Sequence, residues 1–216
     1  MTTEEIMQQI RDEVRVCEKC PLHMQRKNAV PGEGPARVDV MLIGEGPGHH
    51  ENEQGKPFVG QAGMFLDELL AAANLDRKNV FITNVVKCRP PGNRDPEPTE
   101  LSTCRGYLDR QINALNPKII ITLGRFSMAR FVANGKISQI HGQAHLVEGR
   151  TVITMYHPAA ALHQPDLRGS LLRDFANLKT RLAPKPEIPP SSPATPAQKR
   201  PAEKEDDNEY KQLSLF

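Results

Sequence analysis

The chain has 216 residues, of which 28 are Lys or Arg and 26 are Asp or Glu, giving a formal net charge of +2 at pH 7. This length fits one globular domain of roughly 100–200 residues plus an appendage, rather than two full domains. No apolar stretch approaches the ~20 residues of a membrane span, and the start of the chain lacks a signal-peptide core, so we expect a cytoplasmic protein. The near-neutral charge excludes a polycationic protein that wraps nucleic acid, although a local basic groove stays open.

Strand-like and helix-like segments alternate along the first part of the chain. Apolar, β-branched runs typical of strands buried on both faces of a parallel sheet span residues 38–44, 79–86, 118–124 and 151–156. Helical spacing of apolar residues predicts helices over 62–75, 99–115, 124–133 and 167–181, with a hairpin at 136–150. The alternation predicts an α/β three-layer sandwich with a central, mostly parallel four-stranded sheet flanked by helices. In such sheets, ligands bind beyond the carboxyl ends of the strands.

The composition changes sharply after Leu182. Seven of the eighteen residues from 184 to 201 are proline, and such a segment cannot bury enough apolar surface to offset its ordering entropy. An acidic run follows at 203–209, and the chain ends in an apolar pentapeptide. We therefore predict a folded domain over residues 1–182, a disordered Pro-rich and acidic linker over 183–211, and a partner-binding motif over 212–216.

A glycine-rich segment follows the first predicted strand. Residues 44–63 contain six glycines and two prolines, a density that sets a tight backbone close to a flat or anionic ligand. The GxGxxG spacing of dinucleotide-binding turns is absent, and Pro57 follows Lys56 where a P-loop needs Ser or Thr. A nucleotide-dependent enzyme is therefore a disfavoured alternative.

The four cysteines of the chain are spaced as potential metal ligands. Cys17 and Cys20 form a C-x2-C pair, whereas Cys88 and Cys104 follow after a gap of 67 residues and are themselves separated by fifteen. Four spaced thiols in a reducing compartment indicate metal binding or catalysis more often than disulfides. Their spacing is compatible with tetrahedral zinc and with a four-iron four-sulfur cluster, and it does not distinguish the two.

Three polar or aromatic residues lie where the carboxyl ends of the predicted strands meet. His157 ends the fourth strand, Asn84 ends the second, and Phe58 lies inside the glycine-rich segment. A ring can stack on a base, and an amide carries both a donor and an acceptor for a base edge. Together with the imidazole they predict a pocket with one stacking face, one edge reader and one electrostatic donor.

These segments together resemble a known enzyme family. GEGPGHHENEQGKPFVG (44–60), ITNVVKCRPPGNRDP (82–96) and HPAAAL (157–162), with the four cysteines in this order, are similar to the family 4 uracil-DNA glycosylases, the iron–sulfur branch of their superfamily. The resemblance covers about residues 10–180. It implies a monomeric DNA repair enzyme that flips uracil out of double- or single-stranded DNA, hydrolyses its N-glycosidic bond and leaves an abasic site. It also implies that the thiols bind a 4Fe-4S cluster, through Cys17, Cys20, Cys88 and Cys104.

The resemblance also implies roles for single residues of the pocket. Phe58 is implied to stack on the extruded uracil, Asn84 to hydrogen-bond its polar edge, and His157 to donate toward the uracil O2 as negative charge develops there. Such a donor acts in the way of an oxyanion hole, which is the type of stabilisation that cleavage to a uracil anion needs most. His157 is thus expected to be catalytic.

Three further residues belong to the first motif and the segment after it. Glu45 and the Gly46 backbone are implied to lie in the loop that handles the attacking water, and we take Glu45 as the second catalytic residue. Related enzymes often carry Asp or Asn where this chain has Gly46, so no obvious general base stands there. Glu51 is implied to crowd C5 of the base, so that the methyl group of thymine is refused.

The competing hypothesis is a non-catalytic DNA-binding module. It would hold zinc or an iron–sulfur cluster and sense damage without cutting. A binding module would release no uracil, so an excision assay separates the two readings.

The C-terminal pentapeptide resembles the QL[SD]LF motif by which bacterial replication and repair proteins dock on the sliding clamp. The resemblance implies a bacterial, nucleoid-associated protein that binds the clamp through Gln212, Leu213, Ser214, Leu215 and Phe216. Two apolar side chains at the end of an extended arm suit an apolar pocket of a partner, as short linear motifs generally do. A chance match on a frayed terminus is the alternative.

Overall fold

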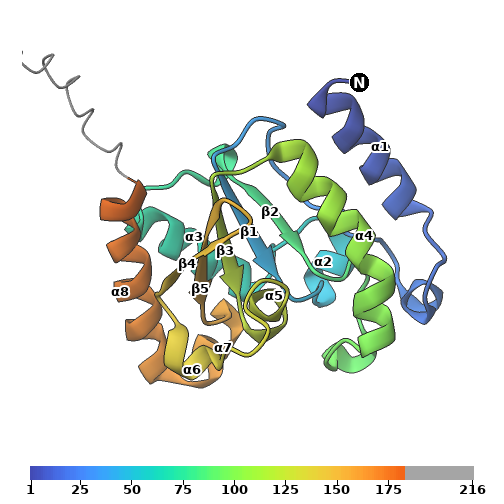
Figure 1. Cartoon of the computed structure of the whole chain (residues 1–216). Helices are drawn as coiled ribbons and strands as arrows, with labels where there is room; N and C mark the ends of the chain where they lie inside the picture. The colour runs from blue at the N-terminus through green and yellow to red at the C-terminus, as the bar shows by residue number, and fades with distance from the viewer. Residues whose placement is uncertain (183–216) are drawn as a thin grey trace, which may run out of the picture. The chain divides into compact units, whose positions relative to one another are not determined.

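The computed structural model describes residues 1–182, and the predicted linker and pentapeptide lie outside the described residues (Figure 1). The helices are α1 (Thr3–Arg15), α2 (His49–Gln54), α3 (Gln61–Ala72), α4 (Pro98–Leu115), α5 (Arg125–Ala129), α6 (Ile137–Ile140), α7 (Pro158–His163) and α8 (Pro165–Leu182). Short 3-10 helices span Pro21–Gln25, Arg77–Asn79 and Pro91–Asn93. The strands are β1 (Val40–Gly44), β2 (Phe81–Asn84), β3 (Ile119–Leu123), β4 (Ala144–Val147) and β5 (Arg150–Met155).

The five strands of the described chain form one sheet in the order β2-β1-β3-β5-β4. Four of them are parallel, and β4 pairs antiparallel with β5 at one edge. The predicted α/β class with a mostly parallel central sheet is confirmed, with a fifth strand beyond the four expected. Because the parallel strands share one direction, β1, β2 and β5 all deliver their carboxyl ends to the same edge of the sheet.

Helices cover both faces of this sheet. The strand β1 contributes residues to the hydrophobic core on each face. Its residues Met41 and Ile43 pack in the cluster that contains α1 and α4, whereas Val40 and Leu42 pack in the cluster that contains α3 and α8. This alternation follows from the period of two in a strand, and it explains why the run reads as continuously apolar. Figure 1 shows α1 and α4 on one side of the sheet and α8 on the other.

The region between β3 and β5 differs from the expected layout. The helix expected over 124–133 ends earlier, as α5 at Ala129, and one helical turn, α6, follows it. The hairpin expected within 136–150 is formed instead by β4 and β5, with its turn at Glu148 and Gly149. Both turn residues have positive φ, 50° and 76°, the conformation that tight two-residue hairpins require. The predicted fourth strand is therefore one arm of the hairpin.

The helix α1 was not expected from the sequence, although its signals are present there. The Thr2 hydroxyl accepts from the Glu5 amide and the Glu5 carboxylate accepts from the Thr2 amide, which is a capping box. Met7, Ile10 and Val14 are buried on one face, at helical spacing. This helix packs on α4 and carries the chain to the first two cysteines. Among the helices within residues 1–182, none is long and apolar enough to span a membrane.

Candidate active site

A cavity of about 350 Å³ opens at the carboxyl edge of the sheet. This volume lies in the usual range of small-ligand pockets. Its lining includes every pocket residue predicted from the sequence: Glu45, Gly46, Glu51, Phe58, Asn84 and His157. The structure thus brings together residues that are more than one hundred positions apart in the chain, because the strands that end in them are neighbours. Pro90, Asn93 and Arg94 also line the cavity, from the loop that follows Cys88.

Asn84 lies at the end of β2 and is 1% exposed. Its side-chain oxygen Oδ1 is buried and has no hydrogen-bond partner within the described residues. A buried acceptor without a partner costs about 1–3 kcal/mol, so its retention indicates that a ligand supplies the donor. A Cβ atom on the neighbouring Gly44 would lie 2.4 Å from this oxygen and 2.7 Å from Cζ of Phe58. Glycine is required at position 44 because both pocket side chains pack directly against its backbone.

Phe58 takes a backbone conformation that non-glycine residues rarely adopt, with φ of 52°. Its ring lies beside the His157 ring, with centroids 5.6 Å apart and planes inclined by 27°. A Cβ atom on Gly63 would lie 2.0 Å from the Phe58 carbonyl oxygen, so the start of α3 rests on the backbone of this residue. The left-handed turn, held against α3, directs the Phe58 ring into the cavity.

Glu51 holds two loops of the cavity together. Its Oε1 accepts from the amides of Val59, at 2.8 Å, and Gly60, at 2.9 Å. Its Oε2 accepts from the amide of Gly48 at 3.1 Å. The carboxylate therefore fixes the backbone that follows Phe58 to the first turn of α2. The family resemblance implied only a selective role for Glu51. Its position three residues after Gly48, the N-cap of α2, is also the sequence signal for this bracing.

His157 is the N-terminal cap of α7. Its Nδ1 accepts from the Ala159 amide at 3.1 Å, so this nitrogen is unprotonated and Nε2 carries the proton. Burial lowers the pKa of His157 from 6.5 to about 4, while the Glu51 carboxylate acts in the opposite direction. The ring is therefore neutral at pH 7 and presents an N–H donor, in a site that disfavours adding a positive charge.

Glu45 directly follows β1 and lines the same cavity. Burial raises the pKa of the Glu45 carboxyl, the Asp95 charge raises it further, and Arg125 opposes both. A carboxylate with a raised pKa is a stronger base than an exposed one. A Cβ atom on Gly46 would lie 2.8 Å from Cγ2 of Val86, so a larger residue fits this backbone only if Val86 moves.

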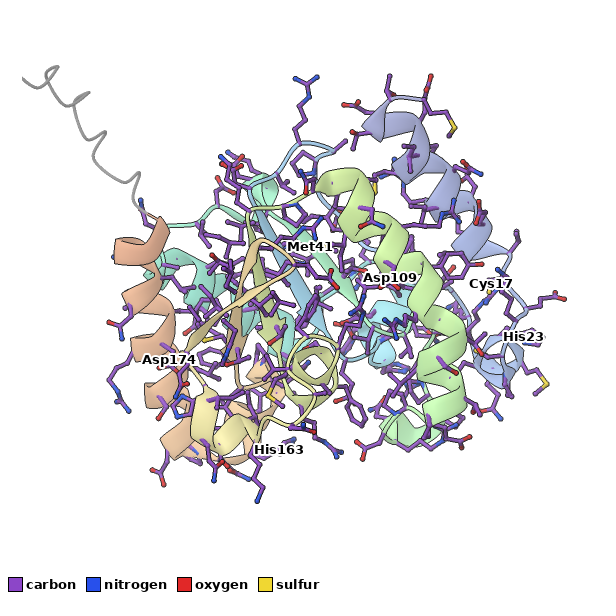
Figure 2. All side chains as sticks on the ribbon, viewed as in Figure 1. Cys17, His23, Met41, Asp109, His163 and Asp174 are labelled. Atoms are coloured by element: carbon purple, nitrogen blue, oxygen red, sulfur yellow. The ribbon has the colours of Figure 1, made fainter. Side chains whose placement is uncertain are left out.

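The four cysteines line a second, smaller cavity between the segment after α1 and the helix α4. Figure 2 shows Cys17 and His23 in that segment, beside α4. All four thiols are free. Burial raises the pKa of Cys88, and it raises that of Cys104 to about 11, so thiolates form here only with a compensating cation.

Four sulfur donors around one cavity are a suitable ligand set for a cluster or for zinc. Within residues 1–182, no three His, Cys, Asp or Glu side chains converge closely enough to form a closed metal site. The donor chemistry therefore fits a bound metal group, since all four thiols line one cavity.

Comparison with known proteins assigns the family. The model of the uracil DNA glycosylase superfamily matches residues 31–180. The chain is 47% identical to a type-4 uracil-DNA glycosylase of Saccharolobus solfataricus over 187 residues, covering 82% of this chain and 87% of the relative. It is 44% identical to the type-4 enzyme of Archaeoglobus fulgidus, covering 81% and 92%, and 40% identical to that of Thermotoga maritima, covering 83% and 96%. The chain belongs to the uracil DNA glycosylase superfamily. Within that superfamily, the type-4 relatives named above match at 40–47% identity, and a type-5 uracil-DNA glycosylase of Thermus thermophilus matches at 32%.

Proposed function

We propose that this protein is a uracil-DNA glycosylase that hydrolyses the N-glycosidic bond of deoxyuridine in DNA, releases uracil and leaves an abasic site. The observation that carries the proposal is the unpaired Oδ1 of Asn84 in the same cavity as the neutral donor His157. The similarity to type-4 uracil-DNA glycosylases over most of the chain supports it.

The pocket groups suit recognition of an extruded uracil. Uracil presents an N3–H donor and an O4 acceptor on one edge, so the Asn84 amide accepts from the first and donates to the second. Cytosine carries a ring acceptor and an amino donor at these positions and mismatches that amide. Phe58 offers its ring for stacking, and Glu51 closes the loop beside the base, where a thymine methyl group is excluded.

The chemical step needs charge stabilisation and an activated water. The C1′–N1 bond breaks with its electron pair going to uracil, whose negative charge spreads to O2. His157 donates from Nε2 to O2 and stabilises that charge. The water oxygen forms the new bond to C1′, and its proton passes to the Glu45 carboxylate. The Gly46 backbone shapes the loop that holds this water. Uracil leaves as the anion and takes a proton from solvent.

The cysteine cavity is proposed to hold a 4Fe-4S cluster, bound by Cys17, Cys20, Cys88 and Cys104. When bound, the cluster supplies structural cross-linking of the segment after α1 to α4 rather than chemistry on the base. Cys88 directly precedes the loop that carries Pro90, Asn93 and Arg94 to the mouth of the active-site cavity. Fixing that loop therefore organises the DNA-facing side of the enzyme.

We propose that the folded domain comprises residues 1–182 and acts as a monomer, since one chain supplies every pocket residue. Residues 183–211 are proposed to be a linker, and Gln212, Leu213, Ser214, Leu215 and Phe216 to bind the sliding clamp. The pentapeptide supports a bacterial source and a place on the nucleoid in the cytoplasm.

An excision assay tests the proposed function. The protein is incubated with labelled oligonucleotides that carry one uracil, opposite guanine, opposite adenine or in a single strand, and strand breaks are counted after alkaline cleavage of abasic sites. A matched oligonucleotide with thymine at the same position is the control. We expect cleavage of the uracil strands alone. Binding of uracil-containing DNA without release of uracil would favour the non-catalytic damage sensor. The absorbance of freshly purified protein distinguishes an iron–sulfur cluster, which is coloured, from zinc, which is not.

A further inference from the structure

Lys87 is a buried cation that the proposed mechanism does not use. It lies between the end of β2 and Cys88, and it is 1% exposed. Its Nζ donates to the Thr83 hydroxyl at 2.6 Å, to the Asn84 carbonyl at 2.8 Å and to Oε1 of Gln111 at 2.7 Å. An ammonium group has three N–H donors, so all of them are used. All three acceptors are neutral, which makes this an expensive group to keep inside a protein without a role.

Two of the acceptors are tied in turn to a third segment. The Thr83 hydroxyl and Nε2 of Gln111 both donate to the carbonyl oxygen of Pro31, at 3.1 Å and 2.6 Å. The main chain repeats the connection, because the Val30 amide donates to the Lys87 carbonyl at 2.7 Å. Lys87 is therefore the centre of a network that joins the end of β2, the helix α4 and the loop at Pro31.

This network acts on the residue that faces the base. The Oδ1 atom of Asn84 has no partner in the described part of the chain, so no hydrogen bond to this oxygen orients the amide before the base arrives. What holds Asn84 is its backbone: β2 pairs it with Gly44 on one side, and Lys87 holds its carbonyl. The backbone sets the direction of the Cα–Cβ bond, and close packing against Gly44 limits rotation of the side chain beyond it. Fixing the carbonyl therefore helps to place the amide before the base enters.

Lys87 also lines the cavity of the four cysteines. One side chain thus lines the cysteine cavity and bonds the backbone of a residue of the active-site cavity, although neither its type nor its spacing marks it in the sequence.

We propose that Lys87 is a positioning residue for uracil recognition, acting through the Asn84 backbone; this inference rests on the proposed glycosylase function. Lys87 itself touches no substrate. Its three hydrogen bonds hold the end of β2 so that the Asn84 amide meets the uracil edge in the cleavage-competent geometry.

A double-mutant cycle tests this role. Lys87→Met keeps the length of the stem and removes the donors; Asn84→Ala removes the base-reading amide; the double variant closes the cycle. The matched control is Lys118→Met, which changes an exposed lysine that pairs with Asp39. We expect Lys87→Met to lower kcat/KM for uracil excision by at least about tenfold. In the Asn84→Ala background the same change is expected to cost less than about twofold, because the amide that Lys87 positions is then gone. The control is expected to match the parent protein.

The comparison is made at equal iron content and equal circular dichroism, so that a folding defect is not counted as a loss of positioning. If Lys87→Met does not fold, Thr83→Val replaces it, since it removes one acceptor of the network while keeping the side-chain shape; the same criterion applies to its cycle. If the parent protein is active and the losses of kcat/KM from the two single substitutions add in the double variant, this inference is overturned and the proposed function is not. Absence of uracil release by the parent would overturn the proposed function, and this inference with it.

Discussion

The active-site cavity and the cysteine cavity are built in opposite ways. The first is braced by hydrogen bonds of the protein itself: Glu51 binds three backbone amides, and the Ala159 amide fixes the tautomer of His157. The second has four free thiols, and Arg26 and Lys87 connect the backbone around them. Arg26 donates to the Cys17 carbonyl at 2.5 Å and to Sγ of Cys88 at 3.3 Å.

The first cavity is built for exact placement of a ligand, and the second contributes to the stability of the domain. The pocket stands ready before its ligand arrives, which lowers the ordering cost of binding and favours the transition state. The cysteine cavity lies between segments far apart in sequence, and burial disfavours its thiolates unless a cation compensates them, so the metal group proposed to bind there would help to hold the domain together. Changes in the first region should therefore alter rates, and changes in the second should alter folding.

The largest effect is expected from removing one thiol. Cys104→Ala takes a ligand from the helix α4 and leaves the proposed cluster incomplete. We expect colourless, poorly soluble protein, with a melting temperature lower by at least about 5 °C. Iron analysis, absorbance and thermal denaturation measure this. Ser102→Ala, on an exposed position of the same helix, is the control and should keep its colour. A stable Cys104→Ala variant with full iron content would contradict the proposed ligand set.

A change in the pocket should instead leave the fold intact. His157→Ala removes the donor to the uracil O2, and loss of one such donor lowers kcat by about 10²–10³. Single-turnover excision on a uracil oligonucleotide measures the chemical step. The iron content is expected to stay near that of the parent protein, and the melting temperature to fall only by the few degrees that loss of the α7 cap costs. An unchanged single-turnover rate would show that another group stabilises the departing base.

Phe58→Ala and Asn84→Ala should lower the excision rate less than His157→Ala does, because both side chains contact only the flipped base. Each is expected to lower excision by at least about tenfold while affinity for undamaged DNA stays nearly the same, because phosphate contacts supply non-specific affinity. Excision rates and fluorescence anisotropy with undamaged DNA check both statements. Leu146→Ala, on the exposed side of β4, is the control. Equal losses on both DNAs would show that these residues maintain the fold instead of reading the base.

The effect of pH should also distinguish the pocket. Burial lowers the pKa of His157 to about 4 in the folded protein, from an ordinary value of 6.5. Between these two pH values the unfolded chain binds the extra proton, so this residue makes the free energy of unfolding fall as the pH decreases from 6.5 toward 4. Urea denaturation of the parent protein and of His157→Asn at pH 7 and pH 5 measures the difference. The parent should lose more stability than the variant; equal losses would mean that His157 titrates normally.

Much of the pocket could be predicted from the sequence because its residues stand in continuous motifs at strand ends. Asn84 ends one buried strand and His157 follows another, and parallel strands bring such ends together. The bracing could not be predicted, since it depends on contacts between segments. Neither the Lys87 network nor the three amides bound by Glu51 leaves a periodic signal. The predicted hairpin at 136–150 includes the residues of β4, but its place in the sheet could not be predicted, because the strand lies at the sheet edge with exposed and half-buried residues in alternation.

The smallest expected effect on excision comes from removing the C-terminal segment, none of whose residues lines either cavity as described. A chain that ends at Tyr210 lacks the pentapeptide proposed to bind the sliding clamp. Leu215 and Phe216 are suited to an apolar pocket, and Gln212 to a polar contact that sets the orientation. A tethered motif raises the concentration of the enzyme near the clamp without altering its active site.

We therefore expect the truncated protein to excise uracil from short oligonucleotides at the rate of the full chain and to lose measurable affinity for the bacterial clamp in calorimetric titration. A full-length variant with Leu215 and Phe216 both changed to Ala keeps the arm and should behave like the truncated chain, which separates the motif from the linker. Clamp binding that survives both changes would show that the pentapeptide is a chance match. Slower excision by either variant on short DNA would show instead that the C-terminal segment contributes to the catalytic domain, and the comparison between the two cavities would then have to include it.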